Sequence, residues 1–162
     1  MTEFMTEQLV KQRQTTATVV KKGALIAVTA LFLLLSMVIS LFMIAFMIML
    51  VVDYFVFPRF NLEFEYTYFT GSLDIDKIMN MQARKRVIST DVKDIDIVAP
   101  TGSPELRPYQ ELKVIHCGTK EPENKTYELV APYKDGKVRI IFEPNEEILK
   151  GMKMLAPRKV IL

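Results

Sequence analysis

A run of thirty residues without a single charge, residues 23–52, constrains this chain more than any other feature of its sequence. Its clearly polar side chains are Thr29, Ser36 and Ser40. About 20 apolar residues in a helix cross the hydrocarbon core of a bilayer, so this run is long enough to do so. Four further apolar or aromatic residues follow Asp53 and extend the segment to residues 23–57.

A signal peptide and a buried core helix are both less compatible with this segment than a membrane span. A secretory signal peptide has an apolar core of about 7–15 residues followed by a small-residue cleavage site, and this segment is too long and lacks such a site. A helix buried in a soluble core would need apolar elements on all its sides, and the rest of the chain does not supply them. We therefore expect a membrane-anchored protein of the cell membrane, with the lipid bilayer as a partner.

The number of crossings stays open between one long helix and a tight two-helix hairpin. As one helix, residues 23–57 would extend about 52 Å, well beyond a hydrocarbon core of about 30 Å. Two spans need about 40 residues and a turn, and no Pro or Gly marks a turn inside the run, where Ser36 and Ser40 are the candidates for a break. Basic residues flank both ends, which favours a hairpin with both flanks in the cytoplasm.

These considerations divide the chain into three parts. Residues 1–22 are expected to form an N-terminal cytoplasmic tail, in which Lys21 and Lys22 fix the topology at the membrane surface. Residues 23–57 form the transmembrane segment. Residues 60–162 form a soluble domain that is expected on the cytoplasmic side.

The periodicity of the sequence changes after the apolar segment. Leu62, Phe64, Tyr66 and Tyr68 alternate with polar residues, as in a strand with one buried face. A turn is expected at 70–72, where Gly71 adopts a positive φ easily. Short strands are also expected at 73–76, 86–90, 95–98 and 112–116, and a final hairpin with strands at 126–131 and 138–142. A turn is expected at Gln82-Ala83-Arg84-Lys85, and a bulge or short helical turn at 91–96.

The C-terminal part predicts an amphipathic helix. Asn145 is a good N-cap, and Glu146 and Glu147 follow in the first turn, where the helix dipole favours anions. Ile148 and Met152 begin an apolar stripe that continues to Leu155, and Pro157 ends the helix. Six or seven short strands followed by one helix predict an α+β fold, a small antiparallel β-roll or barrel that this helix covers.

Three stretches carry a resemblance to known proteins: EYTYFTGSLDIDKI, RKRVISTDVKDIDIV and KDGKVRIIFEPNEEIL. With them, the soluble part resembles bacterial pleckstrin-homology-like (PH-like) domains. The whole chain is similar to an uncharacterised family of small Gram-positive bacterial membrane proteins, a domain of unknown function. The resemblance implies a membrane-anchored PH-like module and no assigned activity. The first hairpin turn has no cation before Lys77, which does not support specific binding of inositol phosphates.

Charge and cysteine content narrow the function. The formal net charge is +2, so nucleic acid is not an expected partner. Cys117 is the one cysteine, which excludes an internal disulfide and fits a reducing compartment. Its neighbour His116 would point to the opposite face of a strand, so the two do not form a nucleophile and base pair.

The candidate site residues are cations. Arg84, Lys85 and Arg86, expected in a turn near the membrane, could contact anionic head groups together with Lys21 and Lys22. The alternative is a solvated turn that protects an edge strand. Asp74, Asp76 and Asn80 lack the spacing of a calcium loop, and no catalytic, cofactor or metal site is expected.

The sequence therefore favours a non-enzymatic, membrane-anchored interaction or scaffold module. A homo-oligomer or a membrane-protein partner is expected, because PH-like sheets have edge strands that can pair with neighbours. Two alternatives stay open. One is a domain that senses anionic lipid at the membrane surface, and the other is a regulatory subunit of a membrane transporter or envelope enzyme.

Overall fold

The structure of the chain is a computed structural model that describes residues 5–81 and 83–162. It contains two compact units. The sheet unit holds the described residues up to Arg13 together with Glu63–Ile78 and Ala83–Leu162. The hairpin unit holds Gln14–Leu62 and the turn that begins at Met79.

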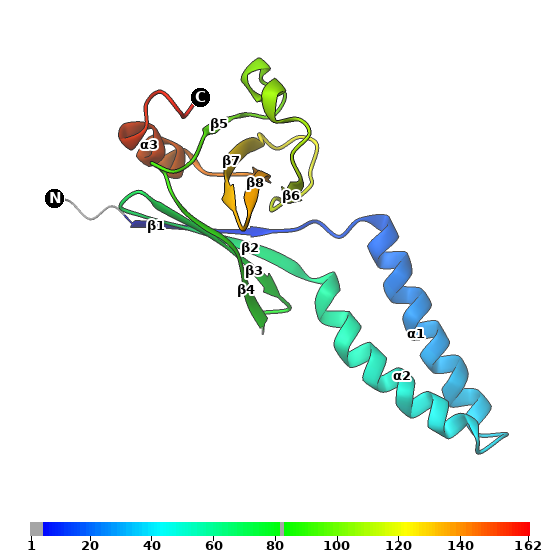
Figure 1. Cartoon of the computed structure of the whole chain (residues 1–162). Helices are drawn as coiled ribbons and strands as arrows, with labels where there is room; N and C mark the ends of the chain where they lie inside the picture. Colours follow the sequence, from blue (N-terminus) through cyan, green and yellow to red (C-terminus); the bar gives the residue numbers. More distant parts are fainter. Residues whose placement is uncertain (1–4, 82) are drawn as a thin grey trace. The chain divides into compact units, whose positions relative to one another are not determined.

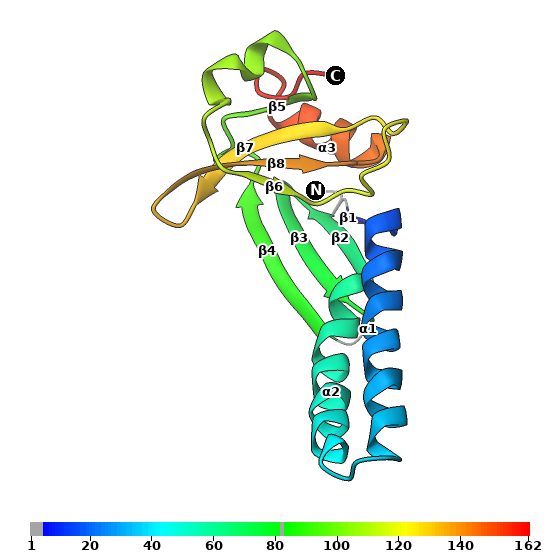
Figure 2. The same ribbon diagram turned by 90° about the vertical axis from the view of Figure 1, so that its right-hand side faces the viewer.

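The hairpin unit consists of two apolar helices that run side by side (Figures 1 and 2). They are α1 (Thr16–Ser36) and α2 (Phe42–Val56), and the short 3-10 helix η1 (Phe57–Phe60) continues α2. The rings of Phe32 and Phe42 stack across the hairpin with their centroids 6.2 Å apart. Of the two alternatives for the apolar segment, the structure therefore has the hairpin and not one long helix.

The helices break where the sequence analysis expected it, between Ser36 and Ser40. The Ser36 hydroxyl donates to the carbonyl oxygen of Leu33 at 2.6 Å, and the N–H of Met37 donates to Leu34. These short-range bonds close the last turn of α1 more tightly than an α-helical bond would. Both helices are long and apolar enough to cross a membrane by length and composition.

The first sheet of the sheet unit contains four antiparallel strands in the order β1-β2-β3-β4 (Figure 1). Alternation of apolar and polar residues in β2 places Phe64, Tyr66 and Tyr68 in the core, as the sequence predicts. The strands are β1 (Met5–Lys11), β2 (Leu62–Phe69), β3 (Ser72–Met79) and β4 (Ala83–Asp91).

Strand β1 is a correction to the expected N-terminal tail at 1–22. Residues Met5–Lys11 pair with β2 along their whole length, from Met5 opposite Phe69 to Lys11 opposite Glu63. Residues 16–22 of the expected tail are helical, because α1 begins at Thr16 rather than at Gly23. The apolar hairpin is thus inserted between two neighbouring strands of one sheet.

Both tight turns of this sheet use positive φ angles at two successive residues. Thr70 and Gly71 have φ values of 43° and 97°, so the turn expected at 70–72 is confirmed. Asn80 and Met81 have φ values of 51° and 56°. The turn expected at Gln82-Ala83-Arg84-Lys85 is wrong from Ala83 onwards, because Ala83, Arg84 and Lys85 belong to β4. Gln82 lies outside the described residues.

The second sheet has the order β5-β7-β8-β6 (Figure 2). The predicted final hairpin is present as β7 and β8, and the predicted short strand at 112–116 is present as β6. In contrast to the expected all-antiparallel roll, β6 pairs parallel to β8. The elements are β5 (Ile97–Pro100), the 3-10 helix η2 (Pro104–Tyr109), β6 (Val114–His116), β7 (Tyr127–Tyr133) and β8 (Gly136–Phe142).

The predicted C-terminal helix is present as α3 (Glu146–Leu155). The side chain of Asn145 accepts a hydrogen bond from the N–H of Ile148 at 2.9 Å, which confirms Asn145 as the N-cap. Ile148 and Met152 are fully buried. They join the core that the inner faces of both sheets share, so the helix covers apolar residues of the sheets as the sequence predicts.

Candidate functional site

The two arginines of the candidate cationic site belong to a network of ion pairs on the first sheet. Arg84 lies 2.5 Å from Glu65 and 3.6 Å from Asp76. Arg86 lies 3.3 Å from Asp74, and its Nε donates to Asp76 at 3.2 Å. We call these five residues the charge ladder. It joins strands β2, β3 and β4 through their side chains.

The charge ladder changes what its arginines can do. Its three carboxylates exceed its two guanidinium groups in number, so the cluster presents no surplus of positive charge. The hydrogen bond to Asp76, followed by the nearby Asp74 carboxylate, raises the pKa of Arg86 above its usual value. Cross-strand pairs of opposite charge support a sheet. The arrangement therefore suits stabilisation of strand β4 better than a grip on anionic head groups.

Lys85 differs from the two arginines beside it. Its side chain is exposed and makes no hydrogen bond or ion pair with any described residue. Of the three neighbouring cations that the sequence singled out, Lys85 is thus the one available to an anion in solution.

The other two candidate residues, Lys21 and Lys22, lie in α1 and not in a tail. Lys21 is exposed. The Nζ of Lys22 donates to the Oδ1 of Asn61 at 3.0 Å and lies 5.8 Å from the ring centroid of Phe60. The side chain of Gln14 also donates to Asn61 Oδ1, at 2.7 Å. These contacts form a polar cluster at the open end of the hairpin, where α1 begins and η1 ends.

The hairpin also contains a polar pair that the sequence analysis did not connect. The hydroxyl of Thr29 donates to the Oδ2 of Asp53 at 2.8 Å, and Thr29 is the buried residue of α1. The other oxygen, Oδ1, is buried and has no hydrogen-bond partner among the described residues. The sequence offered one hint: Asp53 is the acidic residue of the segment 23–57, and Thr29 is one of its few polar side chains. The rotation of each helix, which brings the two together, is not readable from that pattern.

His116 and Cys117 lie in different environments, as expected for neighbouring residues that point to opposite faces. His116 is exposed, whereas Cys117 is fully buried. Burial raises the pKa of Cys117 to about 12. The carbonyl oxygen of Cys117 accepts a hydrogen bond from the hydroxyl of Tyr66 at 2.5 Å, and burial raises the pKa of Tyr66 as well. This part of the chain is therefore a packed core.

Glu143, which lines a hollow together with His116, also has a structural role. A hollow of about 400 Å³ is lined by His116 and Glu143, among other residues. Glu143 accepts hydrogen bonds from the N–H and the hydroxyl of Thr119, both at 2.7 Å, and from Asn124 at 3.0 Å. These bonds hold the loop that follows β6, and they occupy the oxygens that a general base would need.

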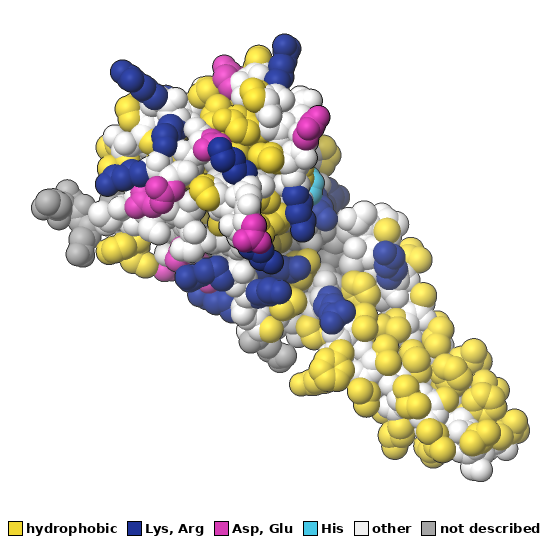
Figure 3. Space-filling model, in the orientation of Figure 1, with side chains coloured by type: hydrophobic (Ala, Val, Ile, Leu, Met, Phe, Trp, Pro, Cys, Tyr) yellow, Lys and Arg dark blue, Asp and Glu magenta, His cyan; other side chains and the backbone are white. Residues whose placement is uncertain are grey.

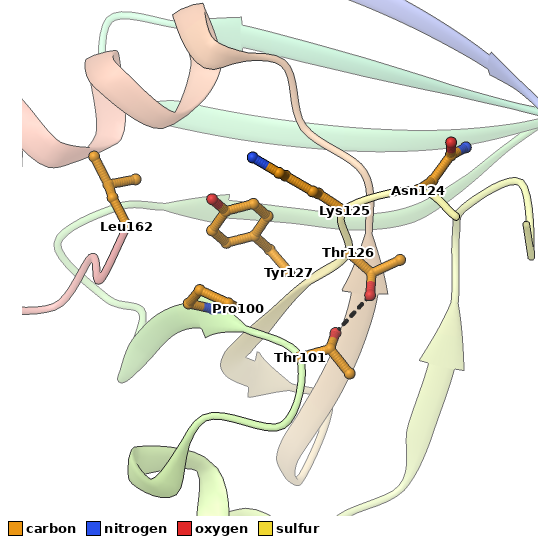
Figure 4. Close-up of a pocket in the computed structure, with 7 residues that line it drawn as sticks. All are labelled: Pro100, Thr101, Asn124, Lys125, Thr126, Tyr127 and Leu162. Atoms are coloured by element: carbon orange, nitrogen blue, oxygen red, sulfur yellow. Dashed lines mark hydrogen bonds between the residues drawn. The ribbon is translucent and has the colours of Figure 1, made fainter. Parts of the chain in front are cut away.

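A second hollow, of about 480 Å³, lies where β5 ends and β7 begins (Figure 4). The hydroxyl of Thr126 donates to that of Thr101 at 2.8 Å on its wall. Lys125 is the charged residue of the lining, and neither a carboxylate nor a histidine or cysteine is among the lining residues. The lining consists of Pro100, Thr101, Asn124, Lys125, Thr126, Tyr127 and Leu162.

Aspartates that could serve as metal ligands have other partners in the structure. Asp74 and Asp76 belong to the charge ladder, and Asp96 pairs with Lys137 at 2.5 Å. Asp91 accepts a hydrogen bond from the N–H of Lys93 at 2.8 Å. Within residues 5–81 and 83–162, no group of three His, Cys, Asp or Glu side chains is arranged to hold a metal ion.

Comparison with known proteins bears on the fold. A family model described as a bacterial PH-like domain, DUF6106, matches residues 2–162. The match includes both the sheet unit and the apolar hairpin. Comparison with curated proteins and comparison with solved structures each gave no match.

Proposed function

The chain belongs to the DUF6106 family of bacterial PH-like domains, and from this premise we propose that it is a non-enzymatic interaction module anchored in the cell membrane by its apolar hairpin. Its soluble part is the sheet unit, which lies on the cytoplasmic side. Its partner is another membrane protein or a second copy of the chain.

The pairing of β1 with β2 is the observation that carries this proposal. β1 precedes the hairpin and β2 follows it, and the two strands are antiparallel neighbours from Met5–Phe69 to Lys11–Glu63. Both ends of the hairpin are therefore tied to one edge of one sheet. A protein built this way has its folded domain on one side of the bilayer whatever the depth of the hairpin, which suits a module that presents a surface at the membrane.

The surface of the hairpin supports membrane anchoring. No residue of the fully described helix α2 is buried, and Figure 3 shows hydrophobic side chains covering the visible face of the hairpin. Ile44, Val51 and Phe55 are between 57% and 63% exposed. Lys21, Lys22 and Arg59 lie near the open end, and cations next to a membrane segment favour the cytoplasmic side.

The sheet unit offers a surface for a partner at its β1 edge. Met5 and Leu9 are 57% and 60% exposed on the outward face of this edge strand, and Phe69, opposite Met5, is 45% exposed. We call these three residues the β1 patch. An exposed edge strand with apolar side chains is a common site of strand addition or docking. The opposite edge, β4, begins with the exposed charged residues 84–86, which oppose such pairing.

The geometry favours this function over lipid sensing. The lipid-sensing alternative relies on Arg84, Lys85 and Arg86, and two of these are paired with carboxylates of the charge ladder. One unpaired lysine contributes about 1 kcal/mol at an anionic surface. That is too little to hold a domain to the membrane without a second attachment.

Site-specific photo-cross-linking in native membranes tests the proposal. The full-length chain carries a photoreactive residue at Leu9 in one variant and at the exposed Ser89 of β4 in the matched control. We expect the chain to stay in the membrane fraction after alkaline washing, and the Leu9 variant to give a discrete adduct that Met5→Lys abolishes. Adducts of equal yield at both positions, or none at either, would show that the β1 patch does not bind a partner.

A further inference from the structure

The complete helices, Thr16–Ser36 and Phe42–Phe60, are long enough to cross a bilayer, but the part of each that carries no charged residue is shorter than the hydrocarbon core. On α1, the uncharged stretch from Gly23 to Ser36 has 14 residues and a length of about 21 Å at 1.5 Å per residue. On α2, the 15 residues from Phe42 to Val56 extend about 22 Å and already include Asp53. The hydrocarbon core of a bilayer is about 30 Å thick. The open end cannot move deeper to make up the difference without burying Lys22 and its partner Asn61.

The tip of the hairpin is apolar, unlike a loop that emerges into water. Residues 37–41 read MVISL, and Ser40 is their polar side chain. Met37, Val38 and Leu41 are 83%, 81% and 72% exposed. Turns in water are rich in Gly, Pro, Asn, Asp and Ser, because these residues suit the backbone and the solvent. This tip has the composition of the helices on either side of it.

The backbone of the hairpin supplies partners for three of the five N–H groups of the tip. The N–H groups of Met37, Val38 and Ile39 donate to the carbonyl oxygens of Leu34 and Leu35 at 2.9–3.2 Å. On the other side of the turn, the N–H groups of Phe42, Met43 and Ile44 donate to Ile39, Ser40 and Leu41 at 3.0–3.3 Å. These bonds favour a tip inside hydrocarbon, where each unsatisfied backbone group is costly. Among the described residues the N–H groups of Ser40 and Leu41 have no backbone partner, and they are the groups that a re-entrant tip leaves to be satisfied in another way.

From these three observations we propose that the hairpin is re-entrant: it enters the bilayer from the side of the sheet unit and turns inside the hydrocarbon, so that residues 37–41 contact lipid acyl chains and do not reach the far surface. The inference rests on the proposed membrane anchoring. With its open end at the near surface, the tip lies about 6 Å beyond the midplane, because an arm of about 21 Å exceeds half of a 30 Å core by that amount.

The chain contains no tryptophan, so one introduced tryptophan reports its own depth. The full-length protein is reconstituted in phosphatidylcholine vesicles with Val38→Trp at the tip, Leu31→Trp in the middle of α1, or Tyr54→Trp near the open end. Quenching is measured with lipids brominated near the acyl terminus or near the head group, and with iodide in the water. We expect the tip and middle positions to be quenched most by the deep bromines, and the Tyr54 position most by the shallow ones.

The outcomes separate the depth of the hairpin from its anchoring. A tip quenched by shallow bromines and by iodide, with the middle position still deep, would overturn the re-entrant hairpin and leave a hairpin that spans the bilayer. A spanning hairpin that thins the bilayer around itself gives this same result. If no position is quenched by brominated lipid and the protein does not float with the vesicles, the proposed membrane anchoring itself fails.

As a second readout, Val38→Cys in a Cys117→Ala background is treated with a membrane-impermeant maleimide before and after the vesicles are opened. We expect no labelling of the tip in either case, and labelling of the matched Lys21→Cys variant once its side of the membrane is accessible. Labelling of the tip in opened vesicles contradicts the proposal.

Discussion

Lys11 and Glu63 face each other across strands β1 and β2, with 3.7 Å between their charged groups, and the whole apolar hairpin lies between them in the sequence. Because β1 and β2 are paired, the hydrophobic segment between them must leave the sheet and return to it at neighbouring positions. In a membrane-anchored chain this pairing, and not the hydropathy of the segment, would exclude a single crossing. It also makes the hairpin removable in principle without breaking the sheet.

The first prediction uses this arrangement to produce a soluble domain. Replacing residues 12–62 by Asn-Gly joins Lys11 to Glu63 through a two-residue turn that suits antiparallel strands. We expect this protein to be soluble and to exceed the fragment 63–162 in unfolding free energy by about 2 kcal/mol, because β1 buries Val10 in the core. Urea unfolding measures the difference. The matched control, Val10→Asp in the joined protein, should lose the gain, and equal stability of joined chain and fragment would mean that β1 contributes nothing.

The second prediction concerns the polar pair in the hairpin. Thr29→Val removes the donor to Asp53 and leaves a half-buried carboxylate without this partner, which costs about 1–3 kcal/mol. Asp53→Leu combined with Thr29→Val removes both partners and is expected to recover most of the loss. Thermal unfolding in detergent of the wild type, Thr29→Val, Asp53→Leu and the double variant gives a double-mutant cycle. If the two substitutions are additive, the hydrogen bond does not stabilise the hairpin.

The third prediction compares Arg86, which belongs to the charge ladder, with its neighbour Lys85, which does not. Arg86→Ala removes both contacts to Asp74 and Asp76, and it should lower the urea midpoint of the soluble joined protein. Lys85→Ala, one residue away and without a partner, should leave stability within about 0.5 kcal/mol. Raising the salt concentration should narrow the difference between the wild-type chain and Arg86→Ala, because salt screens exposed ion pairs. Equal effects of the two substitutions would show that the ladder does not stabilise the sheet.

The fourth prediction follows from the buried thiol. Since burial raises the pKa of Cys117 from 9.0 to about 12, the thiol stays protonated and inaccessible in the folded protein. A thiol reagent at pH 8 should react slowly with the native chain and rapidly in urea. Fast reaction with the native chain would contradict the burial of this residue.

A topology experiment therefore needs a thiol elsewhere, such as Asp135→Cys in the exposed β7–β8 turn. We expect this thiol to be labelled by a membrane-impermeant reagent in lysed cells and not in intact ones.

The raised pKa of Cys117 also predicts how the free energy of unfolding changes with pH. A group whose pKa is higher in the folded state binds its proton more tightly there, so its contribution is complete below the unfolded pKa. For Cys117 this contribution should fall between pH 9 and about pH 12. Cys117→Ala should therefore lose less stability over this interval than the wild-type chain, with Tyr66 responsible for part of the loss that remains. If the free energy of unfolding falls equally with pH in the wild type and in Cys117→Ala, the pKa of Cys117 is not raised in the folded protein.

Local signals in the sequence predicted the elements that local chemistry determines. Gly71 after Thr70 predicted the first hairpin turn, and Asn145 ahead of two glutamates predicted the start of α3. The second turn was misplaced because Asn80 and Met81 form it, and methionine is not a residue that signals a positive φ. That error placed Arg84 and Arg86 in a solvated turn instead of opposite the carboxylates of β3.

Strand β1 and the Thr29–Asp53 pair could not be predicted in the same way. Met5–Lys11 has one buried residue, Val10, so its alternation is weak, and its partner strand follows only after the hairpin. Thr29 and Asp53 meet because of the rotation of α1 against α2, which many side chains determine together. Both features depend on contacts between distant parts of the chain, and periodicity within one segment carries no information on them.

Because the hairpin lies between β1 and β2 in the sequence, the parts of the chain are synthesised in a fixed order. A ribosome makes β1 first, then the whole hairpin, and only then the strand with which β1 pairs. If the hairpin inserts into a membrane as proposed, β1 has no neighbouring strand during insertion and its edge is open. Completion of the sheet thus comes after insertion, and a chain whose hairpin is drawn across the membrane in one direction only would leave β1 and β2 on opposite sides, unable to fold together.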